Sequence, residues 1–437
     1  MIGRSGAPRV SALSAPSSAR RSGAATAATA VHRPPAASTH DWKPAAPSCI
    51  VLTPSSLAGA ILAEPLTLFH LNTERTWRGG EGQTLALATG LARRGHRSVV
   101  IAQRGGELAR RAVAAGLPTH EVAMRGEWDL LAVHRLAGLL RGQRPDVVHM
   151  HTSHAHTLGV LASCFTGIGV RVVSRRVDFS IHRHRFSLSG FKYRHGVDRF
   201  IAISQAVRDQ LVRDGLDPER IALVHSGVDP DRFRGGDAAR ARADLGVPPD
   251  APLFGTVAHF GWHKSLETLI AAAAGVVARV PEAWIAIIGD GDLRPALEAE
   301  RARSPAASRI VMPGFRANVA DFLAAFDLFV MPSVMEGLCT SILDAFAVGV
   351  PVVAARAGGI PELVRDGETG RLVPPRDPEA LAEALATTWR DGGARQRFRA
   401  AAQAHLLGSF THDAMVDGTL AVYRALLRER PTARPAD

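Results

Sequence analysis

Cysteine is scarce in this sequence of 437 residues. Cys49, Cys164 and Cys339 lie far apart, so they form neither the dense framework of a disulfide-stabilised domain nor the close pairs of a zinc site. A chain with so few potential cross-links is typical of a reducing compartment. We therefore expect a cytoplasmic protein.

Long hydrophobic runs are missing as well. The best candidate, from Cys49 to Leu62, is interrupted by Pro54, Ser55 and Ser56, whereas a membrane-spanning helix needs about 18 consecutive apolar residues. We expect no spanning segment, and we expect any membrane association to be peripheral, on the inner face of the plasma membrane.

Acidic residues are almost absent from the N-terminal region. The first 48 residues are rich in Ala, Ser, Pro and Arg, and Asp41 is their single acid. This composition predicts a disordered or low-complexity extension over residues 1–64, either transit-like or the product of a misassigned start codon. Residues 429–437 are predicted to be a short tail.

Positive charge exceeds negative charge over the whole chain. The 52 Lys and Arg residues outnumber the 41 Asp and Glu residues, which gives a net charge of +11. Such a balance favours anionic partners, among them nucleotides, acidic lipids and nucleic acids, and it does not choose between them. Part of the excess reflects the abundance of Arg, Ala, Gly and Pro throughout the sequence.

The chain is long enough for two lobes, each with its own core. Short apolar runs alternate with helical patterns from about Pro65, which predicts an α/β protein with parallel sheets. The predicted strands of the first lobe are 66–71, 98–102, 146–150, 170–174 and 199–203, with a helix over 83–94. Those of the second lobe are 253–258, 284–288, 309–312, 328–331 and 350–354.

A turn-rich stretch, residues 226–236, predicts the boundary between the lobes. We expect a first domain over residues 65–230, a second over 231–412, and a closing helix over 413–428. Open parallel sheets bind ligands at the carboxyl ends of their strands, so two facing lobes predict a site in the cleft between them.

The strongest local pattern places two acids eight positions apart, Glu336 and Asp344, around the start of a predicted helix. Unpaired N–H groups and the positive end of the helix dipole suit a phosphate at such a position. The alternative is that Glu336 and Thr340 cap the helix and that Asp344 is solvated.

Two further motifs follow in order, Gly359-Ile-Pro-Glu362 and Asp366-Gly-Glu-Thr-Gly370. With the acid pair, this succession resembles the C-terminal lobe of glycosyltransferase family 4. The resemblance covers about residues 66–427. It implies the GT-B fold, which consists of two Rossmann-like, doubly wound domains facing across a cleft. It also implies a retaining enzyme that uses a nucleotide sugar donor.

The resemblance assigns roles to the second lobe. Glu336 would lie beside the donor sugar and Asp344 would bind the ribose hydroxyls, although Glu is commoner than Asp at the second position. The helix start at Leu338, Cys339 and Thr340 would bind the donor diphosphate. His259 and Lys264 would hold the same diphosphate, but the family usually has Arg in place of His259; the alternative for Lys264 is a solvated surface lysine.

The resemblance also assigns roles to the first lobe. Gly79 and Gly80 would form a glycine-rich loop over the donor phosphate, although a tight turn explains paired glycines equally well. His151, in the alternating run of His149, His151, His154 and His156, would lie beside the transferred sugar, and His149 would be a buried strand residue. Glu336, His151 and Lys264 are the predicted catalytic residues.

We expect no metal and no cofactor beyond the nucleotide sugar substrate. The histidine run offers metal ligands, but its members are predicted to diverge along a strand and the following loop. Asp290-Gly-Asp292 imitates a metal-binding D-x-D motif, and in this family a turn, here Gly289-Asp290-Gly291, occupies that place on the nucleotide side.

A basic segment over residues 175–195 combines six Lys and Arg residues with aromatic residues. It predicts a surface that faces an acceptor or an anionic membrane, or else a solvated loop. The six cations are Arg175, Arg176, Arg183, Arg185, Lys192 and Arg194, interspersed with Phe179, Phe186, Phe191 and Tyr193 and opposed by Asp178 alone.

The resemblance implies a glycan or lipid-linked acceptor, such as a cell-envelope glycan, a lipopolysaccharide or a glycolipid. Two alternatives stay open. A nucleotide-sugar epimerase or dehydrogenase would need a G-x-G-x-x-G motif after the first strand, and Gly79-Gly-Glu-Gly82 lacks that spacing. A non-catalytic nucleic-acid binder would bind DNA with strong salt dependence, whereas we expect no nucleic-acid partner.

Overall fold

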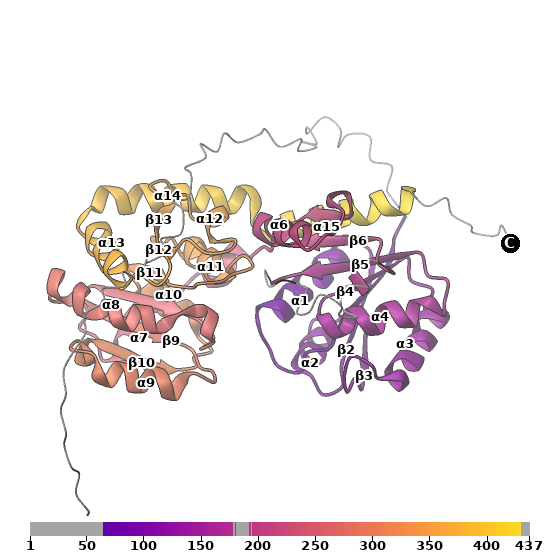
Figure 1. The fold of residues 1–437 in the computed structure, drawn as a ribbon, viewed down its shortest axis with the longest axis horizontal. Coiled ribbons are helices and arrows are strands. Elements are labelled where there is room, and N and C mark those ends of the chain that lie inside the picture. The colour runs from indigo at the N-terminus through magenta and orange to yellow at the C-terminus, as the bar shows by residue number, and fades with distance from the viewer. Residues whose placement is uncertain (1–63, 178–179, 181–191, 194, 430–437) are drawn as a thin grey trace, which may run out of the picture. The chain divides into compact units, whose positions relative to one another are not determined.

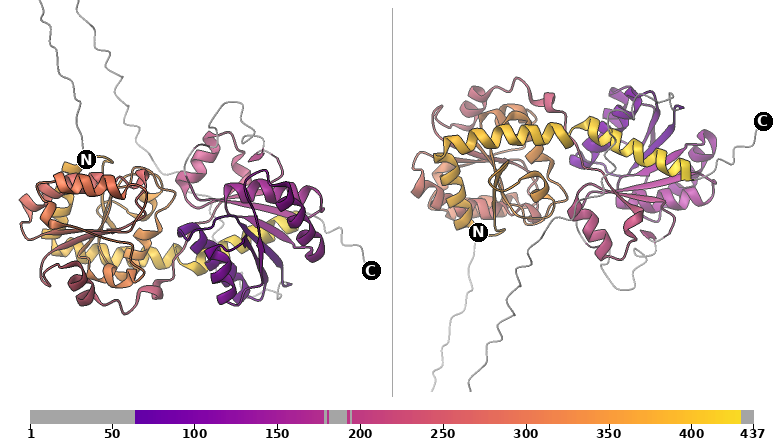
Figure 2. Two further views of the ribbon diagram at one scale, coloured as in Figure 1. Left: turned by 90° about the horizontal axis from the view of Figure 1, so that it is seen from below. Right: turned by 90° about the horizontal axis from the view of Figure 1, so that it is seen from above.

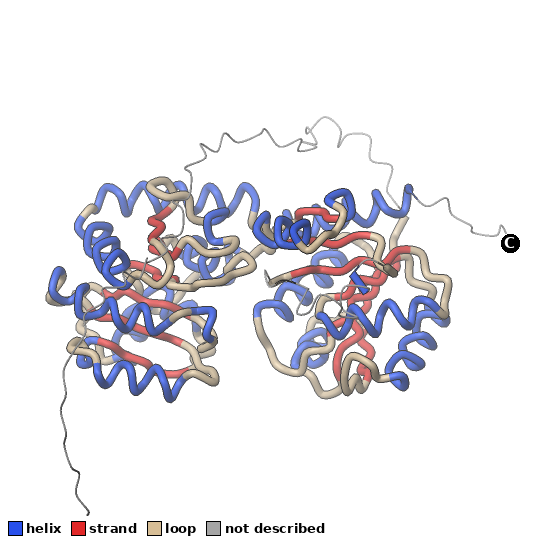
Figure 3. The backbone as a smooth tube through the Cα atoms, viewed as in Figure 1, coloured by secondary structure: helices blue, strands red, loops and turns tan. Residues whose placement is uncertain are grey.

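Two parallel β-sheets with helices packed around them make up the described part of the chain (Figures 1 and 3). The computed structural model describes residues 64–177, 180, 192–193 and 195–429. Cys49, the predicted N-terminal extension up to residue 63 and the predicted tail from residue 430 lie outside the described residues.

The first sheet has seven strands in the order β3-β2-β1-β4-β5-β6-β7, and all neighbouring strands are parallel. The order reverses between β1 and β4. The strands are β1 (Thr67–Asn72), β2 (Arg97–Gln103), β3 (Thr119–Val122), β4 (Val147–Met150), β5 (Val170–Arg175), β6 (Arg199–Ala202) and β7 (Ile221–Leu223). The helices are α1 (Gly79–Arg93), α2 (Glu107–Ala114), α3 (Leu130–Gln143), α4 (Ser153–Cys164) and α6 (Gln205–Arg213).

The second sheet has six parallel strands in the order β10-β9-β8-β11-β12-β13, and its order reverses between β8 and β11. The strands are β8 (Leu253–Val257), β9 (Trp284–Ile288), β10 (Ile310–Gly314), β11 (Leu328–Met331), β12 (Val352–Ala355) and β13 (Gly370–Val373). The helices are α7 (Ala238–Leu245), α8 (Leu266–Arg279), α9 (Arg294–Arg303), α10 (Val319–Ala325), α11 (Thr340–Val348), α12 (Ile360–Leu363) and α13 (Pro378–Arg390).

The central strands are apolar because helices cover both of their faces. All four residues of β4 and all four of β11 are buried, so alternate positions do not need to be polar. This two-sided burial accounts for the largely apolar runs from which these strands are predicted, in which the buried His149 of β4 is an exception.

The closing helices link the two lobes. After α14 (Gly392–Ser409), α15 (His412–Glu429) packs against α1 of the first lobe (Figure 2). Arg94 at the end of α1 forms ion pairs with Asp413 at 3.0 Å and Asp417 at 2.8 Å. Among the described helices, none combines the length and apolar character that crossing a membrane requires.

The α/β architecture matches the prediction, and the differences lie at element boundaries and in short strands. The predicted strands do not include β3 and β13, whose four residues contain too few apolar positions to show a pattern, or β7, which has only three residues. The first sheet ends at Leu223 and the second begins at Leu253, on either side of the turn-rich stretch 226–236.

Helix α1 begins earlier than predicted, at Gly79 instead of Gln83. The carboxylate of Glu81 accepts a hydrogen bond from the backbone N–H of Arg78 at 3.0 Å, which holds the first turn in place. Gly79 and Gly80 are therefore the first residues of a helix, whereas the resemblance implied a glycine-rich loop.

Candidate functional site

The predicted site residues follow the strands at which each sheet reverses its order. Gly79 and Gly80 follow β1, and His151 follows β4. Lys264 follows β8, and Glu336 follows β11. The carboxyl ends of strands at such a switch point form the crevice in which open α/β sheets bind ligands. The topology therefore gathers these side chains at the edge where a ligand is expected.

The first turns of two helices, one from each lobe, meet at this edge. A Cβ atom added to Gly79, the first residue of α1, would lie 3.7 Å from Oγ1 of Thr340, the first residue of α11. Each helix start carries unpaired N–H groups and the positive end of a dipole. Two such ends close together form a strong site for an anion.

Lys264 and Glu336 form a buried ion pair beside these helix starts. Lys264 Nζ lies 2.5 Å from Glu336 Oε1, and the Ser333 hydroxyl donates to the same oxygen at 2.7 Å. The Lys264 side chain is 13% exposed and that of Glu336 is 8% exposed. Burial acts to lower the pKa of Lys264, but the carboxylate of Glu336 outweighs it, so the pKa is raised.

This pairing decides between the alternatives for both residues. Lys264 is not a solvated surface lysine, because its ammonium is buried against a carboxylate. Glu336 does not cap α11: the residue at the N-cap is Cys339, and no side chain accepts a hydrogen bond there. The pair brings a cation and an anion to the carboxyl ends of β8 and β11.

Cys339 adopts a left-handed backbone conformation with φ of 73°, which is uncommon for a residue with a Cβ atom. Its side chain and that of Leu338 are buried in the core, and burial raises the pKa of the Cys339 thiol. Only the backbone groups of Leu338 and Cys339 are therefore available to a ligand.

Asp344 lies about one turn inside α11, because the helix begins at Thr340. Its carboxylate is half-buried and accepts no hydrogen bond from the described residues. Burial raises its pKa to about 7, although Arg232 acts in the opposite direction. A carboxylate left without donors in this way is suited to accept hydrogen bonds from ligand hydroxyl groups.

His259 is exposed at the end of β8, next to the turn of Gly289-Asp290-Gly291. A Cβ atom added to Gly291 would lie 2.8 Å from Cε1 of His259, so the two segments touch. Asp290 is exposed, and its nearest cation is Arg294 at 3.5 Å. This segment forms the rim of the site on the side of the second lobe.

Among the described residues, the side chains that could hold a metal ion together are His70, His149 and His151, whose ligand atoms lie within 4.8 Å of one another. His70 comes from β1 and pairs in register with His149 on β4. His149 is buried, and its ring nitrogens contact the hydroxyls of Tyr423 at 2.5 Å and Ser174 at 2.8 Å.

The third histidine of this cluster, His151, contacts Nδ1 of His70 through its own Nε2 at 3.2 Å. Burial lowers the pKa of both rings, and the nearby cation Arg176 adds to the effect on His151. The three rings are therefore neutral at neutral pH, which suits metal ligation, whereas the positive charge of Arg176 opposes a bound cation. The sequence-based prediction of a site without a metal ion stays a prediction.

The Gly359-Ile-Pro-Glu362 motif connects the second lobe to the first through Glu362. The Glu362 carboxylate accepts hydrogen bonds from the backbone N–H groups of Gln205 and Ala206 at the start of α6, and it pairs with His225 at 3.0 Å. The second motif, Asp366 to Gly370, is a structural turn before β13 in which Asp366 accepts from Leu372 N.

Sequence reasoning missed Arg176 as a member of the site and grouped it with a basic surface segment. Most of that segment lies outside the described residues, including Asp178, Phe179, Arg183, Arg185, Phe186, Phe191 and Arg194. The described members do not form a basic surface: Tyr193 is buried, and Lys192 pairs with Glu127. The signal that could have identified Arg176 is its place directly after β5, which neighbours β4.

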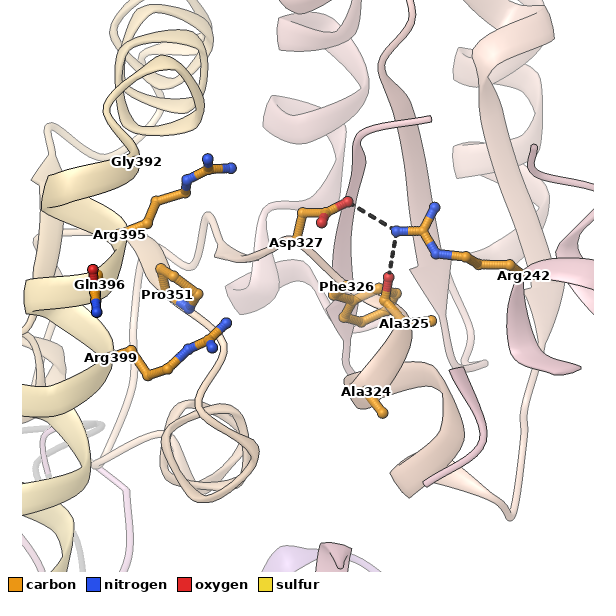
Figure 4. A pocket seen from close by; sticks show the side chains of 10 residues that line it. All are labelled: Arg242, Ala324, Ala325, Phe326, Asp327, Pro351, Gly392, Arg395, Gln396 and Arg399. Carbon is orange, nitrogen blue, oxygen red and sulfur yellow. Dashed lines mark hydrogen bonds and ion pairs between the residues drawn. The ribbon is translucent and has the colours of Figure 1, made fainter. Parts of the chain in front are cut away.

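A separate cavity of about 460 Å³ lies at the opposite edge of the second sheet (Figure 4). It is lined by Asp327 and Pro351, which precede β11 and β12, and by Arg242, Arg395 and Arg399. Arg242 pairs with Asp327 at 2.9 Å, and Arg399 Nε donates to Gly349 O at 2.6 Å. This cavity lies at the amino ends of the strands, away from the site described above.

Two family models match the chain, one in each lobe. Residues 77–232 match the family described as Glycosyltransferase Family 4, and residues 251–391 match the family described as Glycosyl transferases group 1. The first match covers the first sheet except β1, and the second match covers the whole second sheet.

Curated relatives resemble about half of the chain. A D-inositol 3-phosphate glycosyltransferase of Mycobacterium avium is 37% identical over 246 residues, which is 54% of this chain and 57% of the relative. Its counterpart in Rhodococcus jostii is 36% identical over 237 residues, which is 52% of each chain. The chain thus spans about half the length of the curated relatives it matches.

Solved structures share the fold at low sequence identity. Anabaena HepE in complex with UDP and glucose superposes with a TM-score of 0.73 at 21% identity, covering 82% of this chain and 100% of that one. A glycosyltransferase from Rickettsia africae gives a TM-score of 0.74 at 18% identity, covering 84% and 100%. These likenesses confirm the predicted two-domain α/β fold of the GT-B type.

Proposed function

Because the chain belongs to glycosyltransferase family 4, we propose that it transfers a glycosyl group from a nucleoside diphosphate sugar to an acceptor hydroxyl, with retention of anomeric configuration. One observation carries the proposal. The first turns of α1 and α11 face each other beside the buried pair of Lys264 and Glu336. This arrangement offers an anion site next to a carboxylate that can face a sugar.

In this proposal the diphosphate lies at the two helix starts, where Gly79 and Thr340 approach each other. Lys264 moves from Glu336 to a phosphate oxygen when the donor binds, and it then stabilises the negative charge that grows on the departing diphosphate. A preorganised charge of this kind is worth more in a site that excludes water. Asp344 accepts hydrogen bonds from the ribose hydroxyls, and His259 lies at the rim near the phosphates.

Release of Lys264 would leave Glu336 free to face the donor sugar. The acceptor hydroxyl then attacks on the side from which the diphosphate departs, and a diphosphate oxygen takes its proton. Glu336 and the neutral ring of His151 stabilise the sugar as positive charge develops on it. This same-side attack retains the anomeric configuration, and the proposal needs no metal ion.

The acceptor proposed first is a phosphorylated inositol. The curated relatives are D-inositol 3-phosphate glycosyltransferases, and the net charge of +11 suits an acidic acceptor. A cell-envelope glycan, a lipopolysaccharide or a glycolipid, handled by a cytoplasmic enzyme at the inner membrane face, is the second proposal for the acceptor.

The test combines donor binding with transfer. UDP-, GDP- and ADP-sugars are screened by thermal shift, because a ligand at about 100 times its Kd stabilises a protein by roughly 2.7 kcal/mol. The stabilising donor is then incubated with myo-inositol 3-phosphate, with myo-inositol and with lipid-linked glycans, and the anomer of the product is assigned by NMR. A chain that binds none of these donors and instead binds DNA with steep salt dependence would support the nucleic-acid alternative.

A further inference from the structure

Arg176 lies between the helix starts that form the proposed phosphate site. It is the first residue after β5, which ends at Arg175. A Cβ atom added to Gly80, in the first turn of α1, would lie 3.6 Å from Cδ of Arg176. The side chain of Arg176 therefore runs along that turn.

The backbone of Arg176 touches the other side of the site. A Cβ atom added to Gly337, in the loop between Glu336 and α11, would lie 2.1 Å from the carbonyl oxygen of Arg176. Glycine is the only residue that fits this approach, because any side chain would collide with the carbonyl group. Arg176 is thus held between α1 and the loop that carries Glu336.

The guanidinium of Arg176 has no acidic partner among the described residues. Its Nη1 donates to the Ser226 hydroxyl at 3.3 Å, and its buried Nε–H has no hydrogen-bond partner. The carboxylate of Glu81, whose charge acts on Arg176, accepts hydrogen bonds from Asn72 Nδ2 and from Arg78 N. Burial lowers the pKa of Arg176 to about 10, although the charge of Glu81 acts in the opposite direction.

An arginine with a free, buried donor is costly to keep, since a buried charge without a partner destabilises a fold. The other buried cation of the site, Lys264, is already neutralised by Glu336. Arg176 is therefore a buried cation of this site whose charge remains available to an incoming anion, beside the exposed Arg78 at the start of α1.

We propose that Arg176 is a phosphate-binding residue, and that its Nε–H and guanidinium charge engage the diphosphate of the donor between the starts of α1 and α11. The planar guanidinium can donate two parallel hydrogen bonds to phosphate oxygens. The assignment rests on the proposed glycosyltransferase function, which supplies the diphosphate. Phosphate on the acceptor shares the same chemistry, and the position between two helix starts favours the donor.

The experiment measures nucleotide binding by the full chain with and without the phosphates. Wild type, Arg176→Gln and Arg176→Lys are titrated with UDP by calorimetry and with uridine by ligand-observed NMR, and GDP with guanosine and ADP with adenosine are treated alike. The matched control is Arg175→Gln, because the Arg175 guanidinium contacts Tyr193 at 3.1 Å instead of the site. Circular dichroism and melting curves check that each variant is folded.

We expect Arg176→Gln to weaken binding of the nucleoside diphosphate at least tenfold and to leave nucleoside binding within twofold. Arg176→Lys, which keeps a charge but lacks Nε–H, should weaken diphosphate binding by about three- to tenfold. If the Gln variant does not fold, the Lys variant alone tests the assignment. Arg175→Gln should change neither ligand by more than twofold.

Several results would overturn the assignment. Diphosphate affinity within twofold of wild type in either Arg176 variant rules out the contact, and equal losses for nucleotide and nucleoside indicate a structural role. A third result is an unchanged diphosphate affinity together with a raised KM for myo-inositol 3-phosphate but not for myo-inositol. It would show that Arg176 binds the phosphate of the acceptor and not that of the donor. Wild type that binds no nucleotide overturns the proposed function together with this assignment.

Discussion

Asp344 should make the unliganded protein less stable at alkaline than at acidic pH. Its carboxyl group is half-buried, and burial raises its pKa from 3.8 to about 7. The folded state therefore binds a proton more tightly than the unfolded state. The resulting penalty is absent below about pH 4, grows as pH rises, and is complete above about pH 7.

The size of the effect follows from this shift. About three pKa units correspond to roughly 4 kcal/mol at 1.36 kcal/mol per unit, and partial contact of Asp344 with solvent reduces this to about 1 to 3 kcal/mol. Asp344→Asn, which cannot ionise, should gain that stability over wild type at pH 8 and less than half of it at pH 5.

Urea unfolding at pH 5 and pH 8 measures this difference through the change in midpoint at constant slope. The exposed Asp244 of α7 provides the control, because Asp244→Asn should leave the pH dependence unaltered. An Asp344→Asn variant with the same stability difference from wild type at both pH values would refute the reasoning, since Asp344 would then not titrate between them.

The same carboxyl group should couple nucleotide binding to protons. Hydroxyl groups of a bound ribose donate to the ionised form of Asp344, so binding favours loss of its proton. We expect UDP affinity to increase from pH 6 to pH 8 and protons to be released at pH 7, as calorimetry in buffers of different ionisation enthalpy can measure. Asp344→Asn should weaken UDP binding and abolish the proton release.

Three further predictions concern the ion pair and metal dependence. Lys264→Ala should weaken donor binding at least tenfold and also lower the urea midpoint, because it leaves Glu336 buried without its cation; unchanged donor affinity in calorimetry would remove Lys264 from the site. Glu336→Gln should lower kcat about tenfold or more with little change in donor KM, and steady-state kinetics with wild-type kcat would contradict its role at the sugar. EDTA should leave the rate of transfer unchanged, and a loss that manganese restores would show that a metal takes part.

The sequence was sufficient to predict the two sheets because their central strands are buried on both faces. The run 328–331 is apolar at every position, and 147–150 is apolar except for the buried His149, as expected of parallel strands that are covered on both faces. The edge strand β13, Gly-Arg-Leu-Val, lacks such a run because part of its surface is exposed, and β7 is apolar but only three residues long.

The candidate site was predictable where a residue follows a strand at a switch point, as Lys264 and Glu336 do. What the sequence could not show is pairing across the lobes. The approach of Arg176 to Gly337, and the contact of Glu362 with α6, join the first lobe to the second. Such contacts depend on how the lobes meet, and spacing along the sequence does not encode that.

Helix α15 has a consequence for how the protein is made. Apolar residues of α1, Leu87 and Leu91, share a cluster with Val416, Leu420 and Tyr423 of α15. The first sheet ends at Leu223, but this face of it stays uncovered until the ribosome has added the residues up to α15. At about 5 to 20 residues per second, that interval lasts on the order of 10 to 40 s. During synthesis the first lobe thus exposes an apolar surface that a chaperone can bind, and a chain that stops before α15 keeps it exposed permanently.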